Sequence, residues 1–227
     1  MQTVLITGTN RGIGLELVKQ FLAKPYHVIA TYRGKPSDIL TELTQSENIT
    51  LLELEVTSAE SIKALVNKLD NQCIDILINN AGILGPENQS LENIDIEGWM
   101  QTFAVNSISP FVISQALLPL LEQSTAPKII NLSSMMAALH RESTGMYAYR
   151  SSKAALNKIS QTMAVELKHK GFIICPVHPG WVKTDMGGED AEITALESAQ
   201  GIFKLAKNIS IKDSGTFFTW QGDVHVW

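Results

Sequence analysis

TVLITGTNRGIGLELVKQFLAKPYHVIATY, residues 3–32, is the part of the chain from which the fold follows most directly. An apolar, β-branched run at 3–6 predicts a buried strand, and a glycine-rich turn at 7–14 leads into an amphipathic helical pattern at 15–22. A second strand is predicted at 27–32. Strand, helix and strand in this order predict parallel pairing through a right-handed crossover.

The same alternation continues along the chain. Strands that alternate with helices predict a parallel sheet of about seven strands with helices on both faces. We therefore expect an α/β, doubly wound fold in a single domain over residues 1–227, because no repeat or linker interrupts the pattern. The further strands are predicted at 49–56, 74–78, 128–132, 172–177 and near 215–219, and the further helices at 37–46, 58–71, 95–105, 107–122, 147–169 and 190–206.

Composition limits the classes of partner. The chain has 18 basic and 23 acidic residues without a basic block, which argues against nucleic acid as the main partner. No apolar run approaches the ~20 residues that span a bilayer, and no signal-peptide pattern is visible. We therefore expect a cytoplasmic protein that does not enter a membrane. Cys73 and Cys175 lie far apart without metal-ligand spacing, so we expect reduced thiols and no metal site.

The glycine turn carries a nucleotide-binding signal. Gly8, Gly12 and Gly14 follow the first strand, and small residues there let backbone amides approach a pyrophosphate at a helix N-terminus. Their spacing is G-x-x-x-G-x-G rather than the commoner G-x-G-x-x-G. Because the turn stands between a strand and an amphipathic helix, we predict nucleotide binding. The alternative is that these glycines only form a turn.

The end of the second strand indicates which nucleotide binds. An acidic residue there would hydrogen-bond a ribose diol and favour NAD, but the strand ends in Ala-Thr-Tyr-Arg at 30–33. Arg11 in the turn and Arg33 after the strand can both face a 2′-phosphate, which guanidinium groups bind well. NADP(H) is therefore preferred over NAD(H). The alternative is that both arginines are solvated surface residues.

Tyr149 and Lys153 lie four residues apart and therefore on the same face of a predicted helix. A nearby ammonium favours the phenolate and lowers the phenol pKa from about 10 towards neutrality. Such a phenol can give or take a proton at physiological pH. A neighbouring serine, Ser133 or Ser134, can donate a hydrogen bond to a substrate oxygen that gains charge. Taken alone, such a Tyr–Lys pair is usually a solvated helix face.

Together these motifs resemble the short-chain dehydrogenase/reductase family. The resemblance lies, in the family's order and spacing, in TGTNRGIG at 7–14, NNAG at 79–82, Asn106, Ser134, YRSSK at 149–153 and PG at 179–180. The segments at 146–153 and 178–188 are similar to the C-factor and sniffer-type carbonyl reductases. The resemblance implies a Rossmann-type NAD(P)-binding domain, an NADPH-dependent reductase of small aldehydes or ketones, and a homodimer or homotetramer.

The resemblance also implies roles for individual residues. Tyr149 would donate a proton to the carbonyl oxygen, and Lys153 would lower its pKa and hold the nicotinamide ribose. Ser134 would hydrogen-bond the substrate oxygen, and Asn106 would hold a water that links Lys153 to solvent. The cofactor-binding set implied in the same way is Gly8, Asn10, Arg11, Gly12, Ile13, Gly14, Arg33, Glu55, Val56, Asn80, Ala81, Gly82, Tyr149, Lys153, Pro179, Gly180, Val182 and Thr184.

Neighbouring residues compete with some of these assignments. The active serine of the family is usually the second of two, so Ser134 is preferred over Ser133. Tyr147 lies six residues before Lys153 and faces elsewhere on a helix. His140 and His178 fall on no catalytic position of the family, and we interpret them as a loop residue and a strand-end residue.

Two departures from the family pattern affect the site. The adenine-contacting position after the third strand usually carries aspartate, whereas this chain has Glu55 followed by Val56. The loop between the serine and the tyrosine is slightly longer than usual, which changes the wall of the pocket. Apolar side chains at these positions favour an adaptable substrate pocket, although methionines are more often plain core; they are Met135, Met136, Leu139, Met146, Trp181 and Met186.

Two other functions stay open. One is a C-factor-like signalling or interaction protein that binds a nucleotide structurally. The set Ser134, Tyr149 and Lys153 favours an enzyme instead, because a scaffold has no need of a tuned phenol. The other is an NAD(H)-linked alcohol dehydrogenase. The absence of an acidic residue after the second strand argues against it.

Overall fold

The computed structural model describes residues 1–227 and is built on one seven-stranded sheet. The strand order is β3-β2-β1-β4-β5-β6-β9, and all neighbouring strands are parallel. The order reverses at β1, so the crevice between the carboxyl ends of β1 and β4 is the ligand position of such a sheet. The predicted doubly wound fold is confirmed. The strands are β1 (Gln2–Ile6), β2 (Tyr26–Tyr32), β3 (Ile49–Glu53), β4 (Ile76–Asn79), β5 (Lys128–Leu132), β6 (Ile173–His178) and β9 (Phe218–Thr219).

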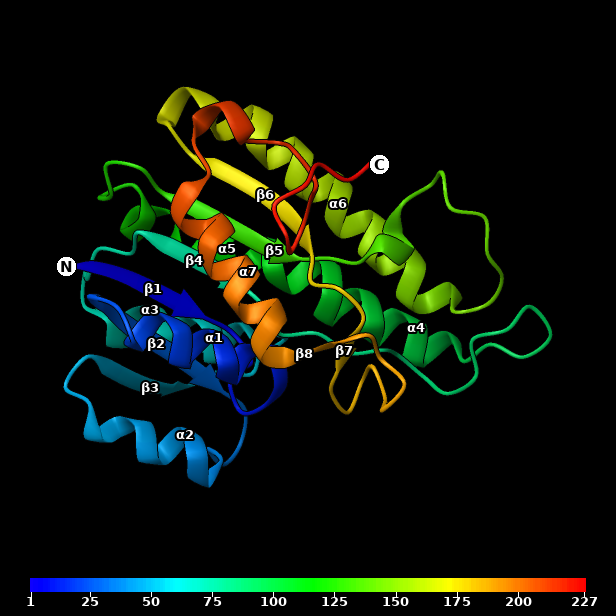
Figure 1. Ribbon diagram of the computed structural model, residues 1–227, viewed down its shortest axis with the longest axis horizontal. Helices are drawn as coiled ribbons and strands as arrows, with labels where there is room; N and C mark the ends of the chain where they lie inside the picture. Colours follow the sequence, from blue (N-terminus) through cyan, green and yellow to red (C-terminus); the bar gives the residue numbers. More distant parts are fainter.

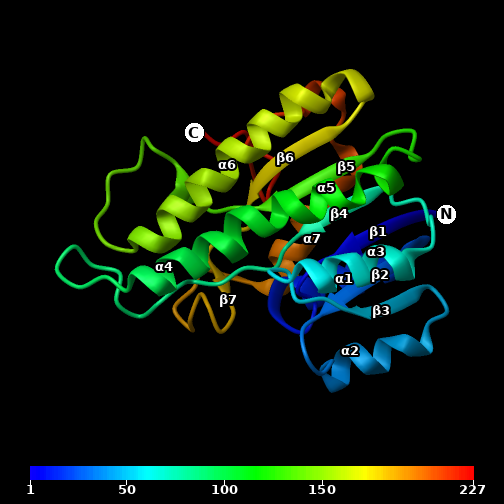
Figure 2. The same cartoon turned by 180° about the vertical axis from the view of Figure 1, so that it is seen from behind.

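Helices cover both faces of the sheet. Figure 1 shows α1 and α7 across the near face, and Figure 2, from behind, shows α3, α5 and α6 across the other. Alternation along β1 supplies both cores, because Val4 and Ile6 join the cluster beneath α1 and α7 while Leu5 joins the cluster beneath α3, α5 and α6. The helices are α1 (Gly12–Leu22), α2 (Asp38–Glu42), α3 (Ala59–Leu69), α4 (Ile96–Phe103), α5 (Ser109–Leu121), α6 (Tyr147–Leu167) and α7 (Ala195–Asn208).

The predicted boundary of the last helix was wrong. α7 begins at Ala195 rather than near 190, because the preceding residues form a small parallel pair, β7 (Val182–Lys183) with β8 (Ile193–Thr194). Thr194 and Glu197 then close a capping box at the start of the helix. The pair of short strands holds the segment after β6 in place beside the ligand crevice.

The two helices predicted at 95–105 and 107–122 form one continuous run. A π-helical turn, η2 (Ala104–Ile108), joins α4 to α5. Pro110 at the start of α5 has no N–H to donate to the residue four positions back, and the wider turn precedes it. The Ser109 hydroxyl donates to the Ala104 carbonyl at 2.7 Å within this turn. Such turns often mark functional positions in helices.

The joined run Ile96–Leu121 differs from the expectation drawn from the sequence. It is 26 residues long and contains an 18-residue window of mean hydropathy 1.5, which is apolar enough to span a membrane by composition alone. In the structure, 56% of that window is buried inside the protein. The apolar residues Ile113, Leu117 and Leu121 pack against the sheet, so this face of the helix is core.

Candidate active site

The glycine turn is tied to the end of β4 by a compact set of hydrogen bonds. The Asn80 side-chain amide donates to the carbonyls of Thr7 and Gly8 at 2.7 and 2.8 Å. The Thr7 hydroxyl accepts from the backbone N–H groups of Asn80 and Ala81, both at 3.0 Å. The crevice between β1 and β4 is therefore built from backbone atoms held in place by two polar side chains.

This turn leaves no room for side chains at its glycines. Gly8 and Gly12 have φ angles of 70° and 55°, where only glycine is unstrained. A Cβ on Gly14 would lie 2.2 Å from the Gly8 carbonyl oxygen, and one on Gly8 would lie 2.9 Å from the Ala81 Cα. Ile13 packs its side chain against the core. The bare backbone at the N-terminus of α1 fits the pyrophosphate of a nucleotide.

The two arginines expected to face a 2′-phosphate flank this turn and are exposed. Arg11 precedes α1 and pairs with Asp185 at 2.6 Å, and Arg33 follows β2 and pairs with Glu55 at 3.6 Å. Glu55 also accepts a hydrogen bond from the Thr57 hydroxyl at 2.9 Å. Exposed ion pairs of this kind contribute little to stability, so both guanidinium groups can exchange these partners for a phosphate.

Asn10 links the glycine turn to the loop after β2. Its amide nitrogen donates to the Lys35 carbonyl at 2.9 Å, and its amide oxygen accepts from the Ser37 N–H at 2.9 Å. Val56 lies after β3 and packs against the core on the other face of the sheet. The residues expected to surround the adenosine end thus come from the ends of three neighbouring strands.

The segment after β6 approaches the glycine turn from the opposite side. A Cβ on Gly12 would lie 3.2 Å from the methyl carbon of Thr184. The Pro179 carbonyl accepts from the Ser198 hydroxyl at 2.6 Å, Gly180 has a φ of 92°, and Val182 is buried in β7. The structure therefore brings the segment expected to hold the nicotinamide next to the turn expected to hold the pyrophosphate.

Tyr149, Lys153 and Ser134 come together in the interior, where β5 ends and α6 begins. All three are less than a tenth exposed, and the Ser134 side chain lies near enough to the Tyr149 phenol to lower its pKa. The Lys153 ammonium lies 6.0 Å from the centre of the Tyr149 ring. The solvated-face alternative for this pair is thus at odds with the structure, because both side chains are buried.

The neighbours that competed with these residues face elsewhere. The Ser133 hydroxyl donates to the Asn157 side-chain oxygen at 2.5 Å and takes no part in the contact with the phenol. Tyr147 is exposed at the start of α6. His140 lies exposed in the loop after Ser134, and His178 is the last residue of β6. Burial, with His225 and Arg141 nearby, lowers the pKa of His178 to about 4, so its ring is neutral at physiological pH.

The direction of the tyrosine pKa shift differs from the sequence-based expectation. Burial raises the pKa of Tyr149, and the neighbouring Ser134 side chain lowers it only in part. Burial also lowers the pKa of Lys153 to about 8. The desolvation of the phenol is the largest effect on its pKa, and the ammonium, 6.0 Å from the ring centre, does not reverse it.

Asn106 lies at the centre of the π-helical turn and is fully buried. Its side chain pairs with both backbone groups of Ile83, accepting at 2.9 Å and donating at 2.8 Å, and it also donates to the Ser152 hydroxyl at 3.1 Å. A Cβ on Gly82 would lie 3.2 Å from the Asn106 amide oxygen and 3.5 Å from the Lys153 nitrogen. Asn106, Gly82 and Lys153 therefore converge on one small region.

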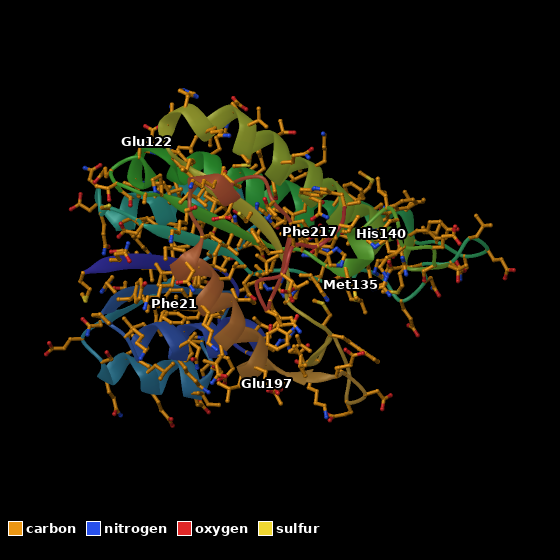
Figure 3. The ribbon with its side chains drawn as sticks, turned by 45° about the horizontal axis from the view of Figure 1, so that its top comes forward. Phe21, Glu122, Met135, His140, Glu197 and Phe217 are labelled. Carbon is orange, nitrogen blue, oxygen red and sulfur yellow. The ribbon has the colours of Figure 1, made fainter.

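The apolar residues expected to wall a substrate pocket lie on two loops at the carboxyl end of the sheet. Met135, Met136 and Met146 are partly buried, whereas Leu139 is 87% exposed. In Figure 3, Met135 and His140 lie near Phe217 from the C-terminal segment, away from Glu122 at the far end of α5. Trp181 and Met186, on the loop after β6, are both exposed, so these residues form an open wall rather than core.

Two residues of the site were missed in the sequence. Thr7 holds the ends of β1 and β4 together, and its signal was available, since it directly precedes the first glycine of the turn. Gln89 contacts the Tyr149 backbone from the loop before α4. No periodicity or motif marks Gln89, because the contact joins residues 60 positions apart.

Comparison with known proteins agrees with this geometry. The sequence profile described as short chain dehydrogenase matches residues 2–195. The chain therefore belongs to the short-chain dehydrogenase family of oxidoreductases.

Individual relatives are similar over most or all of the chain. The C-signal protein of Myxococcus xanthus is 38% identical over 155 residues, which are 68% of this chain and 93% of that protein. The NADPH-bound carbonyl reductase from chicken fatty liver has a TM-score of 0.92 and 35% identity, covering 100% of this chain and 99% of the other. The carbonyl reductase Sniffer of Drosophila melanogaster has a TM-score of 0.93 and 32% identity, with 100% of both chains covered.

Proposed function

We propose that the protein is an NADPH-dependent reductase that converts an aldehyde or ketone to an alcohol, with Tyr149 as the proton donor. The observation that carries this proposal is that Ser134, Tyr149 and Lys153 are buried together, with the Lys153 ammonium 6.0 Å from the centre of the Tyr149 ring. The similarity to the NADPH-bound chicken carbonyl reductase supports the same assignment.

The proposed cofactor fits the residues around the crevice. The bare backbone of the glycine turn, between Gly8 and Gly14, suits a pyrophosphate, and Arg11 and Arg33 are exposed and able to pair with a 2′-phosphate. When bound, the reduced nicotinamide supplies the hydride. The protein holds and orients the reactants, keeps water away and manages the proton.

The state of Tyr149 suits a proton donor. Because burial raises its pKa, the phenol keeps its proton at physiological pH. An alkoxide formed at the carbonyl oxygen is more basic than a phenolate, so the proton passes from Tyr149 to that oxygen, while Ser134 donates a hydrogen bond to it. Lys153, whose pKa is about 8, exchanges protons near neutral pH and can return a proton to the tyrosine. The path of this proton would run beside Gly82, where the Lys153 nitrogen and the Asn106 amide oxygen lie close together.

The test is turnover with defined carbonyl compounds. Loss of reduced-nicotinamide absorbance is followed with NADPH and then NADH against a panel of aldehydes, ketones and quinones. We expect turnover with at least one carbonyl and a preference for NADPH. Tight binding of NADPH without turnover across the panel would contradict the reductase assignment.

A second candidate function rests on the similarity to the C-signal protein. A signalling role that uses the nucleotide structurally would need the glycine turn but not the phenol of Tyr149. The two candidates therefore separate on Tyr149→Phe, which removes a reductase activity and leaves an interaction role intact.

A further inference from the structure

Gln89 is a buried polar side chain that uses both ends of its amide. It lies in the loop between β4 and α4 and is 6% exposed. Its amide nitrogen donates to the carbonyls of Leu84 and Pro86 at 3.1 and 2.8 Å. Its amide oxygen accepts from the backbone N–H of Tyr149 at 3.0 Å. The side chain thus connects its own loop to the first turn of α6.

The N-cap residue of α6 provides no capping hydrogen bond. Met146 occupies the N-cap position with a φ of 56°, and its side chain makes no capping hydrogen bond. The first N–H groups of a helix have no partner within the helix. The N–H of Tyr149, the third residue of α6, is one of these, and Gln89 supplies its acceptor from 60 positions away.

We propose that Gln89 is a positioning residue for Tyr149. It anchors the backbone of the turn that carries the phenol, so that the hydroxyl stays against Ser134. This inference rests on the proposed reductase function. It goes beyond that function in assigning to the reaction a residue that acts through the backbone of Tyr149.

The anchor continues into the rest of the site. The loop that holds Gln89 also contains Ile83, which is paired through both backbone groups with Asn106. Asn106 in turn donates to the Ser152 hydroxyl on α6. The helix that carries Tyr149 is therefore bonded to Gln89 through its backbone and to Asn106 through the Ser152 side chain. The loop between β4 and α4 takes part in both contacts, because it contains Gln89 and is paired with Asn106.

The position of Gln89 is closely packed. A Cβ on Gly85 would lie 3.3 Å from the Gln89 amide nitrogen and 2.7 Å from the Thr102 hydroxyl. Helix ends fray readily when their N–H groups lose their acceptors. Because displacement of a catalytic group by about 1 Å can cost on the order of 100-fold in rate, loss of this anchor is expected to lower turnover.

The test compares Gln89→Met, which keeps the shape and removes all three hydrogen bonds, with Gln101→Met on the exposed face of α4. For Gln89→Met we expect kcat to fall by roughly 10- to 100-fold with little change in the KM or Kd for NADPH. The Tyr149 amide should exchange with deuterium faster, while amides in α5 keep their protection. Gln101→Met should match the unmodified protein in every measurement.

A second variant grades the loss of the anchor. Gln89→Glu sets a carboxylate oxygen against the Leu84 and Pro86 carbonyls, where the unmodified side chain has its amide nitrogen, so it should lower kcat at least as much as Gln89→Met. Equal kcat in Gln89→Met and the unmodified protein would overturn the inference. So would a Gln89→Glu variant as active as the unmodified protein, or a loss of protection spread evenly over the molecule.

Failure of the two proposals can be told apart. If the unmodified protein reduces no carbonyl compound, the proposed function fails, and with it any role for Gln89 in that reaction. Exchange at the Tyr149 amide then still reports whether the anchor exists. If the unmodified protein is active and Gln89→Met is equally active, only the inference about Gln89 fails.

Discussion

The Lys153 ammonium donates a hydrogen bond to the Leu132 carbonyl oxygen at 2.7 Å, which joins α6 to the last residue of β5. This is its one hydrogen bond within the protein, although the side chain is 5% exposed. A single carbonyl compensates little of the solvation that a buried ammonium loses. The pKa of Lys153 accordingly falls from 10.5 to about 8.

This shift predicts how stability depends on pH. Between pH 8 and pH 10.5 the folded protein has released the Lys153 proton while the unfolded chain still holds it, so the free energy of unfolding rises with pH in this window. The full effect is roughly 3 kcal/mol. The charged lysine thus costs stability at neutral pH, and this cost disappears as the pH approaches 10.5.

Denaturant unfolding of the unmodified protein and Lys153→Met checks this at several pH values. The free energy of unfolding of the unmodified protein, minus that of the variant, should increase between pH 7 and pH 10.5. The same comparison with Lys63→Met, which removes an exposed lysine of α3, should give a constant difference. A constant difference for Lys153→Met as well would mean that its pKa is not lowered.

Arg33→Ala should change the preference between nucleotides. Loss of a hydrogen-bonded contact to a charged group costs about 1.5–3 kcal/mol, so we expect NADPH to bind about 10- to 100-fold more weakly. NADH has no 2′-phosphate, and its affinity should be almost unchanged. Fluorescence titration with both nucleotides measures this, with Lys24→Ala, just before the start of β2, as the control. Equal losses for NADPH and NADH would show that Arg33 does not contact the 2′-phosphate.

Gly14→Ala should disrupt the nucleotide crevice. Its Cβ would meet the Gly8 carbonyl oxygen and the Asn80 amide, which forces the turn apart. We expect a loss of about 1–3 kcal/mol in stability and weak NADPH binding. Gly171→Ala is the control, because this glycine has a positive φ and an added Cβ would meet no atom. It lies just before the start of β6, at the end of the sheet away from the nucleotide crevice. It should lose some stability and keep NADPH binding; undiminished binding in Gly14→Ala would contradict the assignment.

An exposed apolar hollow predicts self-association. It has a volume of about 310 Å³, and its lining residues are Ile96, Trp99, Met100, Phe103 and Ile108. Exposed apolar patches of this kind mark interaction surfaces, and we expect a homodimer or homotetramer that uses this face. Light scattering should give a multiple of the monomer mass for the unmodified protein and for Leu196→Glu on α7, and a lower mass for Met100→Glu. A monomeric unmodified protein would rule this expectation out.

The arrangement of the fold was predictable because each strand is a short apolar run between turn residues. Val4, Leu5 and Ile6, for example, are buried on both faces of the sheet, which is why this run shows no alternation with polar residues. Shorter elements were missed. β7 and β8 pair over two residues each, and such a ladder depends on the tertiary contact rather than on a pattern in either segment.

Sequence motifs predicted the positions of the main site residues. They did not predict the properties and contacts that depend on how distant segments pack together. The positions of Tyr149, Lys153 and the glycine turn were marked by spacing. The direction of the Tyr149 pKa shift was not, because it depends on burial by residues from several elements. The ion pair between Arg11 and Asp185 and the contact of Gln89 with Tyr149 join distant segments, and no local pattern encodes either.

The central claim is that Tyr149 donates the proton, and Tyr149→Phe tests it most directly. The measurement is NADPH oxidation with the best carbonyl substrate, alongside Tyr147→Phe, which removes an exposed hydroxyl from the same turn of α6. We predict that Tyr149→Phe lowers kcat by about 100-fold or more and leaves the Kd for NADPH within a few-fold, while Tyr147→Phe stays fully active. Turnover retained in Tyr149→Phe would contradict the account.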